Sequence, residues 1–382
     1  MARIKVTAPL LNKRMAPVTD ETDTTNVIGE VVAGFEFESV AEITNALGTW
    51  YRDRDGYYYW GGGVSAGNNQ VLEKKYFSDH WFDELNILSV WNANSERGEN
   101  ATALILDSGI NSNIIQLASA LQQPVQNFVP GSSTADSIDP EFHGTHCASL
   151  IAARSKLQFI GAAPACTLLA AKITDNGALS NADTMKSALQ EFLDDKYQFD
   201  IISISQELYQ ADNELEELIR KHIAKNRIVI ASIGNDYDYQ NSNFPRYPGC
   251  LTECISVGSC NNDKTLSPFS MYPSKTDIFC FGENIYAYQN SKEPGALTGT
   301  SQATAILAGI SCLVISWLKK NDFVYNNSSI KDLFKKYSIP LQGNPLLPLI
   351  DPESIFGTLQ KFKKNGNKNL QDCIDVDVVG VV

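Results

Sequence analysis

The chain has 382 residues, of which 43% are hydrophobic and 20% are charged. This is the composition of an ordinary soluble globular protein, and it excludes wholesale disorder. The length predicts one large domain and one small one. The formal net charge of -13 excludes a nucleic-acid-binding protein, which needs a basic surface to replace phosphate counterions.

Residues 1–66 consist of segments of strand length. NVIGEVV (26–32) and FEFESVAEI (35–43) are examples, and Gly, Asn or Asp residues bound such segments, as is typical of β-strands. The Asp55-Gly56 turn stands between two aromatic-rich segments, which is a strong hairpin signal. We expect a small antiparallel β-barrel whose aromatic residues form either its core or a recognition patch. In its length and its hairpin the segment resembles a bacterial SH3-like domain, which implies a protein or cell-wall ligand.

Residues 67–79 are predicted to be a linker. The N-terminal sequence has basic residues but no uninterrupted apolar stretch that ends in small residues, so we expect no secretory signal and a cytoplasmic protein. In so large a chain the eight cysteines are expected to be reduced thiols. Cys250, Cys254 and Cys260 lack the paired spacing of a zinc site, and we expect neither a metal nor a cofactor.

From residue 80 onward, apolar runs alternate with amphipathic stretches. Four of the runs have the composition of parallel strands buried on both faces: ATALILD (101–107), CTLLAAKI (166–173), DIISIS (200–205) and RIVIAS (227–232). Helical periodicity and capping Asn or Asp residues mark 181–195 and 212–226. The alternation predicts an α/β domain over 80–358 with a mostly parallel, doubly wound sheet, followed by a polar tail over 359–382.

The longest apolar run covers residues 303–318 and is interrupted by Gly309, Ser311 and Ser316. It is short for a transmembrane helix. We therefore expect a buried helix and no contact with a membrane.

Asp107 ends the apolar run ALILD, and Ser108-Gly109 turns the chain away from it. An Asp in such a place often only caps a turn. However, active sites of parallel sheets gather at the carboxyl ends of the strands. Asp107 is therefore also a candidate functional carboxylate.

His143 and His146 are two of only four histidines in the chain. They lie in HGTHCAS, where a glycine-containing turn leads into LIAA, a stretch that suits a buried helix. A lone histidine is more often structural than catalytic, and as a metal pair these two lack the Glu that HExxH supplies as general base. His143 remains a candidate base because of this turn.

Ser301 stands in GTSQA at the start of the long apolar run. A serine there can simply be an N-cap, but the position also aims backbone N–H groups and the positive helix end at charge that develops on a substrate. GxSxG is absent here, because Ala303 stands where the last Gly is required, and GDSGG does not occur. Both absences argue against the α/β-hydrolase and trypsin types of site.

Together, the motifs around Asp107, His143 and Ser301 resemble the signatures of subtilases, which carry their triad in this order. WFDELNILSVWN (81–92) is similar to the lead-in helix of that domain, and IVIASIGN (228–235) is similar to the strand that ends in its oxyanion asparagine. The resemblance implies a serine endopeptidase that uses these three residues as an Asp-His-Ser triad and forms an acyl-enzyme.

The resemblance also implies roles outside the triad. Asn235 is expected to donate to the oxyanion. Ser203, Ile204 and Ser205 are similar to the strand that pairs with an extended peptide or protein substrate, although Ser205 stands where the family often has a Gly that lets the substrate approach.

Two alternatives concern the function and the N-terminal segment. The chain could be a catalytically idle binding protein with the subtilase fold, but the intact triad and Asn235 favour an enzyme. Secreted subtilases carry a self-cleaved inhibitory propeptide where this chain has residues 1–66. Because the segment shows no amphipathic helix of three turns, we expect a permanent accessory domain instead.

Overall fold

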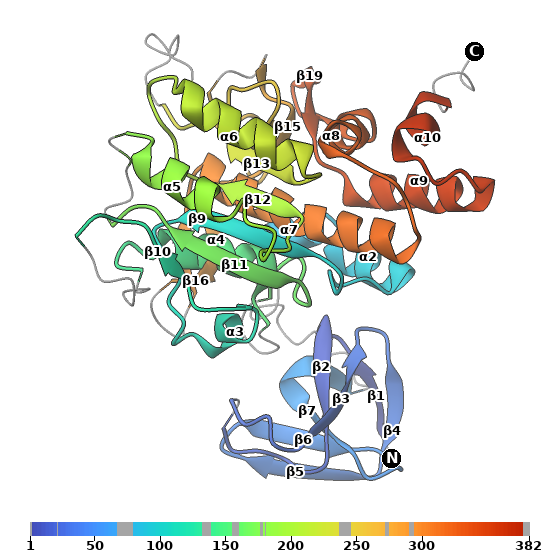
Figure 1. Ribbon diagram of the computed structural model, residues 1–382. Helices are drawn as coiled ribbons and strands as arrows, with labels where there is room; N and C mark the ends of the chain where they lie inside the picture. The colour runs from blue at the N-terminus through green and yellow to red at the C-terminus, as the bar shows by residue number, and fades with distance from the viewer. Residues whose placement is uncertain are drawn as a thin grey trace. The chain divides into compact units, whose positions relative to one another are not determined.

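The computed structural model describes residues 2–376 except 21, 67–78, 132–138, 155–159, 176–178, 180, 237–245, 272–274 and 290–293. The described residues up to Asp79 form one compact unit, and His80–Arg154 together with the described residues from Gly161 onward form another (Figure 1). The predicted linker lies outside the described residues except for Asp79.

The N-terminal unit is made of short strands. Their bounds are β1 Ala2–Val6, β2 Leu10–Arg14, β3 Val27–Val32, β4 Glu36–Ser39, β5 Ala41–Asn45, β6 Gly48–Arg52, β7 Tyr58–Trp60 and β8 Val64–Ala66, with the 3-10 helix η1 at Gly61–Gly63. They form two antiparallel sheets with the orders β4-β1-β8 and β3-β2-β7-β6-β5. Ile4 and Val6 alternate toward a small core that also contains Leu11, Tyr59 and Val64.

The predicted aromatic hairpin is confirmed in β6 and β7. Trp50 is paired with Trp60, and Tyr51 with Tyr59. The turn between them includes Gly56, whose φ of 93° is a left-handed conformation that glycine adopts without strain. Trp50 and Tyr59 are buried, whereas Trp60 and Tyr51 are partly exposed. The aromatic side chains are thus divided between the core and the surface.

A nine-stranded sheet forms the centre of the second unit. Its strands are β9 Thr102–Asp107, β10 Gln126–Asn127, β11 Thr167–Lys172, β12 Ile201–Ile204, β13 Ile228–Ser232, β14 Ile255–Cys260, β15 Ile278–Phe281, β18 Ile339–Leu341 and β19 Asn344–Leu349. The order is β10-β11-β9-β12-β13-β14-β15-β19-β18, and only the pair β18–β19 is antiparallel among the described strands of this sheet. The predicted, mostly parallel α/β sheet is therefore confirmed.

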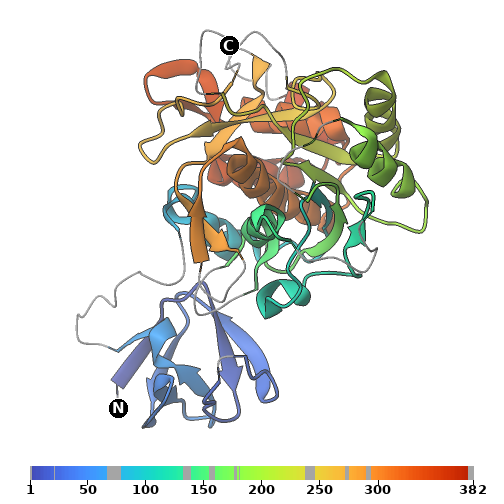
Figure 2. The ribbon, with the colours of Figure 1, turned by 90° about the vertical axis from the view of Figure 1, so that its left-hand side faces the viewer.

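Helices cover both faces of this sheet. Their bounds are α1 His80–Glu84, α2 Ile87–Asn94, α3 Ile115–Ala118, α4 His143–Ala152, α5 Asp183–Glu191, α6 Asn213–Ala224, α7 Thr300–Lys320, α8 Asn327–Lys336, α9 Pro352–Asn365 and α10 Leu370–Val376. Leu104 and Leu106 of β9 pack with α5 and α6, while α4 and α7 pack together and α7 contacts β12 to β15. Figure 2 shows the sheet between these two helical layers. A separate hairpin, β16 Ile285–Tyr288 with β17 Pro294–Leu297, contacts α4.

The long apolar run forms the buried helix α7, as predicted. Within the described residues it is the one helix long and apolar enough to cross a membrane, but its apolar stretch is entirely buried inside the protein. Its side chains are covered because the helix runs against the centre of the sheet and against α4.

The prediction of a polar tail over 359–382 was wrong for its described part. Residues up to Asn365 belong to α9, and α10 follows. Leu359 and Phe362 lie three positions apart on α9 and are both buried, so they share the inner face of the helix. The exposed lysines of the same segment make its overall composition polar, so composition alone did not indicate this apolar face.

Candidate active site

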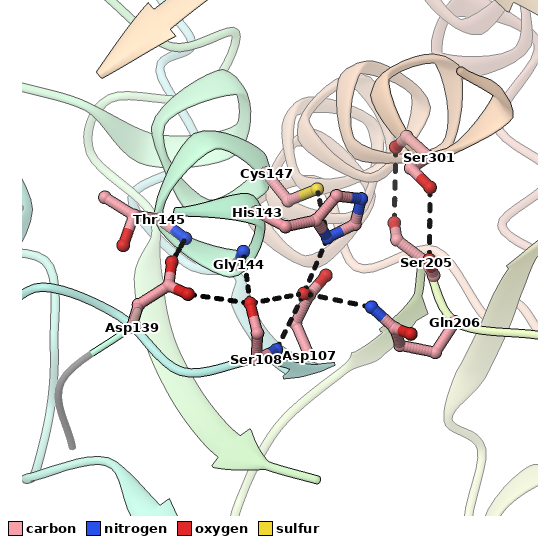
Figure 3. A network of polar contacts seen from close by, with 10 residues as sticks. All are labelled: Asp107, Ser108, Asp139, His143, Gly144, Thr145, Cys147, Ser205, Gln206 and Ser301. Carbon is pink, nitrogen blue, oxygen red and sulfur yellow. Dashed lines mark hydrogen bonds and ion pairs between the residues drawn. The ribbon is translucent and has the colours of Figure 1, made fainter. Parts of the chain in front are cut away.

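Asp107 and His143 are brought together where β9 ends and α4 begins. Asp107 is the last residue of β9, and His143 is the first residue of α4. His143 Nδ1 and Asp107 Oδ1 are 2.7 Å apart. The Asp107 side chain is 1% exposed and that of His143 is 23% exposed. The pair therefore joins a buried carboxylate to an imidazole that solvent and substrates can reach (Figure 3).

Hydrogen bonds hold the Asp107 carboxylate in its charged form. Asp107 Oδ1 accepts the backbone N–H of Ser108 at 2.7 Å and the side-chain amide of Gln206 at 3.3 Å. Burial opposes ionisation, but the interaction with His143 and these donors outweigh it, and the pKa of Asp107 lies below its usual value.

The same pairing raises the basicity of His143. Burial disfavours the imidazolium, but the Asp107 carboxylate overcomes this penalty and holds the pKa of His143 well above its usual value. An imidazole in this setting takes up a proton readily, as a general base must.

Glycines allow the close approach of α4 to the end of β9. A Cβ atom on Gly144 would overlap the carbonyl oxygen of Gly109, so no other residue fits at that position without displacing the backbone. Gly109 itself has a φ of 116°, which favours glycine. Gly109 and Gly144, which follow Ser108 and His143 in the two motifs, are therefore favoured there for steric reasons.

Ser301 lies in the first turn of α7 and is 7% exposed. Its hydroxyl donates to the carbonyl oxygen of Ser205 at 3.1 Å, and the Ser205 hydroxyl donates to the carbonyl oxygen of Ser301 at 3.2 Å. Within the part of the chain that the structure describes, Ser301 makes no hydrogen bond to His143. Figure 3 shows the second ring nitrogen of His143 facing the side on which Ser301 and Ser205 lie. Catalytic hydrogen bonds often tighten only when substrate binds.

Asn235 follows β13 and is exposed. Its side-chain oxygen accepts two hydrogen bonds from Thr300, from the backbone N–H at 2.8 Å and from the hydroxyl at 3.0 Å. These bonds fix the orientation of the amide beside the start of α7. A fixed donor of this kind can stabilise an oxyanion without reorganisation.

Two of the three residues expected to pair with substrate were assigned wrongly. Ser203 and Ile204 lie inside β12, whose two edges are hydrogen-bonded to β9 and β13. Their backbone groups are therefore already used, and both residues are buried. Ser205 lies just beyond the strand and next to Ser301, so it alone of the three is placed near the nucleophile candidate.

Asp107, His143 and Cys147 offer three ligand atoms within 4.8 Å of one another. The arrangement suits a hydrogen-bonded pair better than a metal ion, because Asp107 Oδ1 and His143 Nδ1 already share a short hydrogen bond. Burial also raises the pKa of Cys147, whereas a metal binds the thiolate. His146, the second histidine of the motif, is buried, and its Nε2 contacts the carbonyl oxygens of Ile285 and Gly295. It has a structural role.

Sequence reasoning missed three polar partners of the pair. Ser108 and Gln206 contact Asp107 directly, and Asp139 contacts the Ser108 hydroxyl. Ser108 is adjacent to Asp107 and Asp139 is four residues before His143, so their proximity to the motifs was the available signal.

Several known proteins are similar in sequence to this chain. The family model described as the subtilase family matches residues 98–368. An intracellular serine protease of Paenibacillus polymyxa is 30% identical over 234 residues, covering 59% of this chain and 69% of the relative. Thermitase of Thermoactinomyces vulgaris is 28% identical over 243 residues, covering 63% and 84%.

Subtilisin E of Bacillus subtilis is 28% identical over 220 residues, which cover 57% of this chain and 56% of the relative. The chain therefore belongs to the subtilase family. By class it is a serine endopeptidase, whose substrates are peptides or proteins.

Proposed function

We propose that Asp107, His143 and Ser301 form the catalytic triad with which this chain hydrolyses peptide bonds. The observation that carries the proposal is the 2.7 Å hydrogen bond between Asp107 and His143. Without such a partner, burial of the charged Asp107 carboxylate would be energetically costly. Ser301 supports it as the first-turn serine of a buried helix whose start lies beside Ser205 and Asn235.

In this mechanism His143 removes the proton of the Ser301 hydroxyl as its oxygen attacks the substrate carbonyl carbon. The tetrahedral intermediate then expels the amine, which takes the proton from His143, and an acyl-enzyme on Ser301 remains. Water, activated by His143 in the same way, hydrolyses the ester. Asp107 keeps the imidazole in the tautomer that has its proton on Nδ1 and stabilises the imidazolium.

The oxyanion is stabilised by the Asn235 amide and the backbone N–H of Ser301. The Asn235 side chain is already oriented by Thr300, and the N-terminal end of α7 adds its positive dipole end. Both donors thus act on charge that the substrate lacks and that develops as the tetrahedral intermediate forms.

The test compares wild type with Ser301→Ala on an unstructured protein substrate. Loss of the nucleophile should lower turnover about a millionfold. Ser311→Ala is the matched control, because Ser311 is another buried serine of α7 whose hydroxyl donates to Leu307. Turnover of Ser301→Ala within tenfold of wild type would contradict the proposal. A folded wild-type protein that cleaves nothing would favour the idle binding protein.

We also propose that residues 1–66 are an SH3-like barrel and a permanent accessory domain, joined to a peptidase domain that begins at residue 80 and includes α9 and α10. Tyr57, Tyr58 and Trp60 are partly exposed, and Lys13 lies 3.9 Å from the Tyr57 ring centroid. Aromatic and basic side chains together suit recognition of a protein or cell-wall ligand. The name of the Paenibacillus polymyxa relative supports a cytoplasmic location.

A further inference from the structure

A second buried carboxylate lies beside the Asp107–His143 pair. Asp139 has no exposed surface. One of its oxygens, Oδ1, is 2.8 Å from the Ser108 hydroxyl, and the other, Oδ2, accepts the backbone N–H of Thr145 at 2.7 Å. Asp139 therefore ties the residue after Asp107 to the first turn of the helix that begins with His143 (Figure 3).

The Ser108 hydroxyl stands between two carboxylates and has a single proton to donate. It is 2.8 Å from Asp139 and 3.2 Å from Asp107 Oδ1, and it accepts the backbone N–H of Gly144 at 3.0 Å. Asp107 Oδ1 already accepts hydrogen bonds from His143 and from the backbone of Ser108. The shorter distance and this crowding place the hydroxyl proton on the side of Asp139.

The pKa of Asp139 lies above its usual value. Burial is the main cause, the hydrogen bonds from Thr145 and Ser108 oppose it, and the Asp107 charge adds to it. Other ionisable groups on neighbouring elements are His143, His146 and Cys147 on α4 and Lys172 at the end of β11. Lys172 forms an ion pair with Asp175 at 2.7 Å.

We propose that Asp139 is a positioning residue of the triad, which holds the Ser108 hydroxyl and the start of α4 and adds a second negative charge that favours the protonated form of His143. The inference rests on the proposed function of Asp107, His143 and Ser301. A carboxylate that only capped α4 would use the bond to Thr145 and would leave the titration of His143 unchanged.

Asp139→Asn separates these two roles. The amide oxygen can still accept from Thr145, and the amide NH₂ can donate to the Ser108 hydroxyl, which then turns its own proton toward Asp107 at 3.2 Å. Thr145, Ser108 and Gly144 each keep a partner, so the variant should fold. The negative charge is lost and Asp107 gains a donor, and both changes weaken the attraction between Asp107 and the imidazolium.

The experiment measures the pH dependence of kcat/KM for wild type and Asp139→Asn. The acid-side midpoint of Asp139→Asn should lie lower by roughly half a pH unit or more, as expected for the loss of one nearby, partly screened charge. Asp277→Asn is the matched control. Asp277 is a buried carboxylate at the opposite end of the strands that also accepts a backbone N–H, from Ser256, and its variant should keep the wild-type midpoint.

An unchanged or raised midpoint in Asp139→Asn, with cleavage still dependent on Ser301, would overturn this inference and leave the proposed function intact. Absence of Ser301-dependent cleavage in wild type would instead overturn the proposed function. If Asp139→Asn does not fold, Ser108→Ala replaces it. Removal of the hydroxyl takes away a donor that favours charged Asp139, so its midpoint should also be lowered, and a wild-type midpoint would refute the proposal.

Discussion

Two substitutions of Asn235 should lower turnover alike and differ in stability. Asn235→Ala removes both the NH₂ donor and the oxygen that accepts two hydrogen bonds from Thr300. Asn235→Asp keeps an oxygen acceptor for Thr300 but has no NH₂ group. Loss of one oxyanion donor costs about 10² to 10³ in kcat, or about 2.7–4 kcal/mol. We expect at least that loss in both variants, with little change in KM.

The free energy of unfolding separates the two variants. Two net hydrogen bonds are worth about 1–3 kcal/mol, and because Asn235 is exposed water replaces part of them, so Asn235→Ala should lose about 1 kcal/mol. Asn235→Asp should be close to wild type. Steady-state kinetics and urea unfolding measure the two effects. An unchanged kcat in Asn235→Asp would refute the oxyanion role, and equal stability of all three proteins would refute the orienting role of Thr300.

Three further predictions concern pH and processing. First, kcat/KM should rise with pH through a midpoint above 6.5. The reason is that Asp107 holds the pKa of His143 above that value and only the neutral imidazole is a base. A profile highest near pH 4 would contradict this prediction. Second, burial raises the pKa of Glu96, which is 0% exposed, to about 7. The stability that its protonated form contributes is lost as pH rises through that value. Glu96→Gln should therefore be more stable than wild type by up to about 3 kcal/mol at pH 8.5 and not at pH 5, and a pH-independent difference in urea unfolding would show this wrong. Third, wild type and Ser301→Ala should have the full intact mass; loss of about the first 66 to 80 residues from wild type alone, with a gain in activity, would indicate a propeptide.

Much of the fold could be predicted from local sequence patterns. The strands around Leu104 and Ile202 have apolar residues on both faces, and the Asp55-Gly56 turn separates two aromatic strands, so both were predictable from neighbouring residues. Leu359 and Phe362 also had a helical spacing, but the lysines around them dominated the composition. The helical C-terminal segment was missed for that reason.

The site was predictable only where residue type limits the chemistry. Asp107 and His143 stood out by motif, and the structure brings them together. Ser203 was assigned wrongly because a sequence does not show that both edges of its strand are already paired. Asp139 lies four residues before His143, but its importance depends on a tertiary contact with Ser108, which its position in the sequence does not show.

The measurement that most directly tests the triad is labelling with a fluorophosphonate, followed by mass mapping of the modified residue. Only a serine activated by a general base reacts readily with this reagent. The account predicts one label per chain, on Ser301, in wild type, and a rate lower by several orders of magnitude in His143→Ala. Labelling of folded wild type at another residue, or no labelling at all, would contradict it, as would an equal rate in His143→Ala.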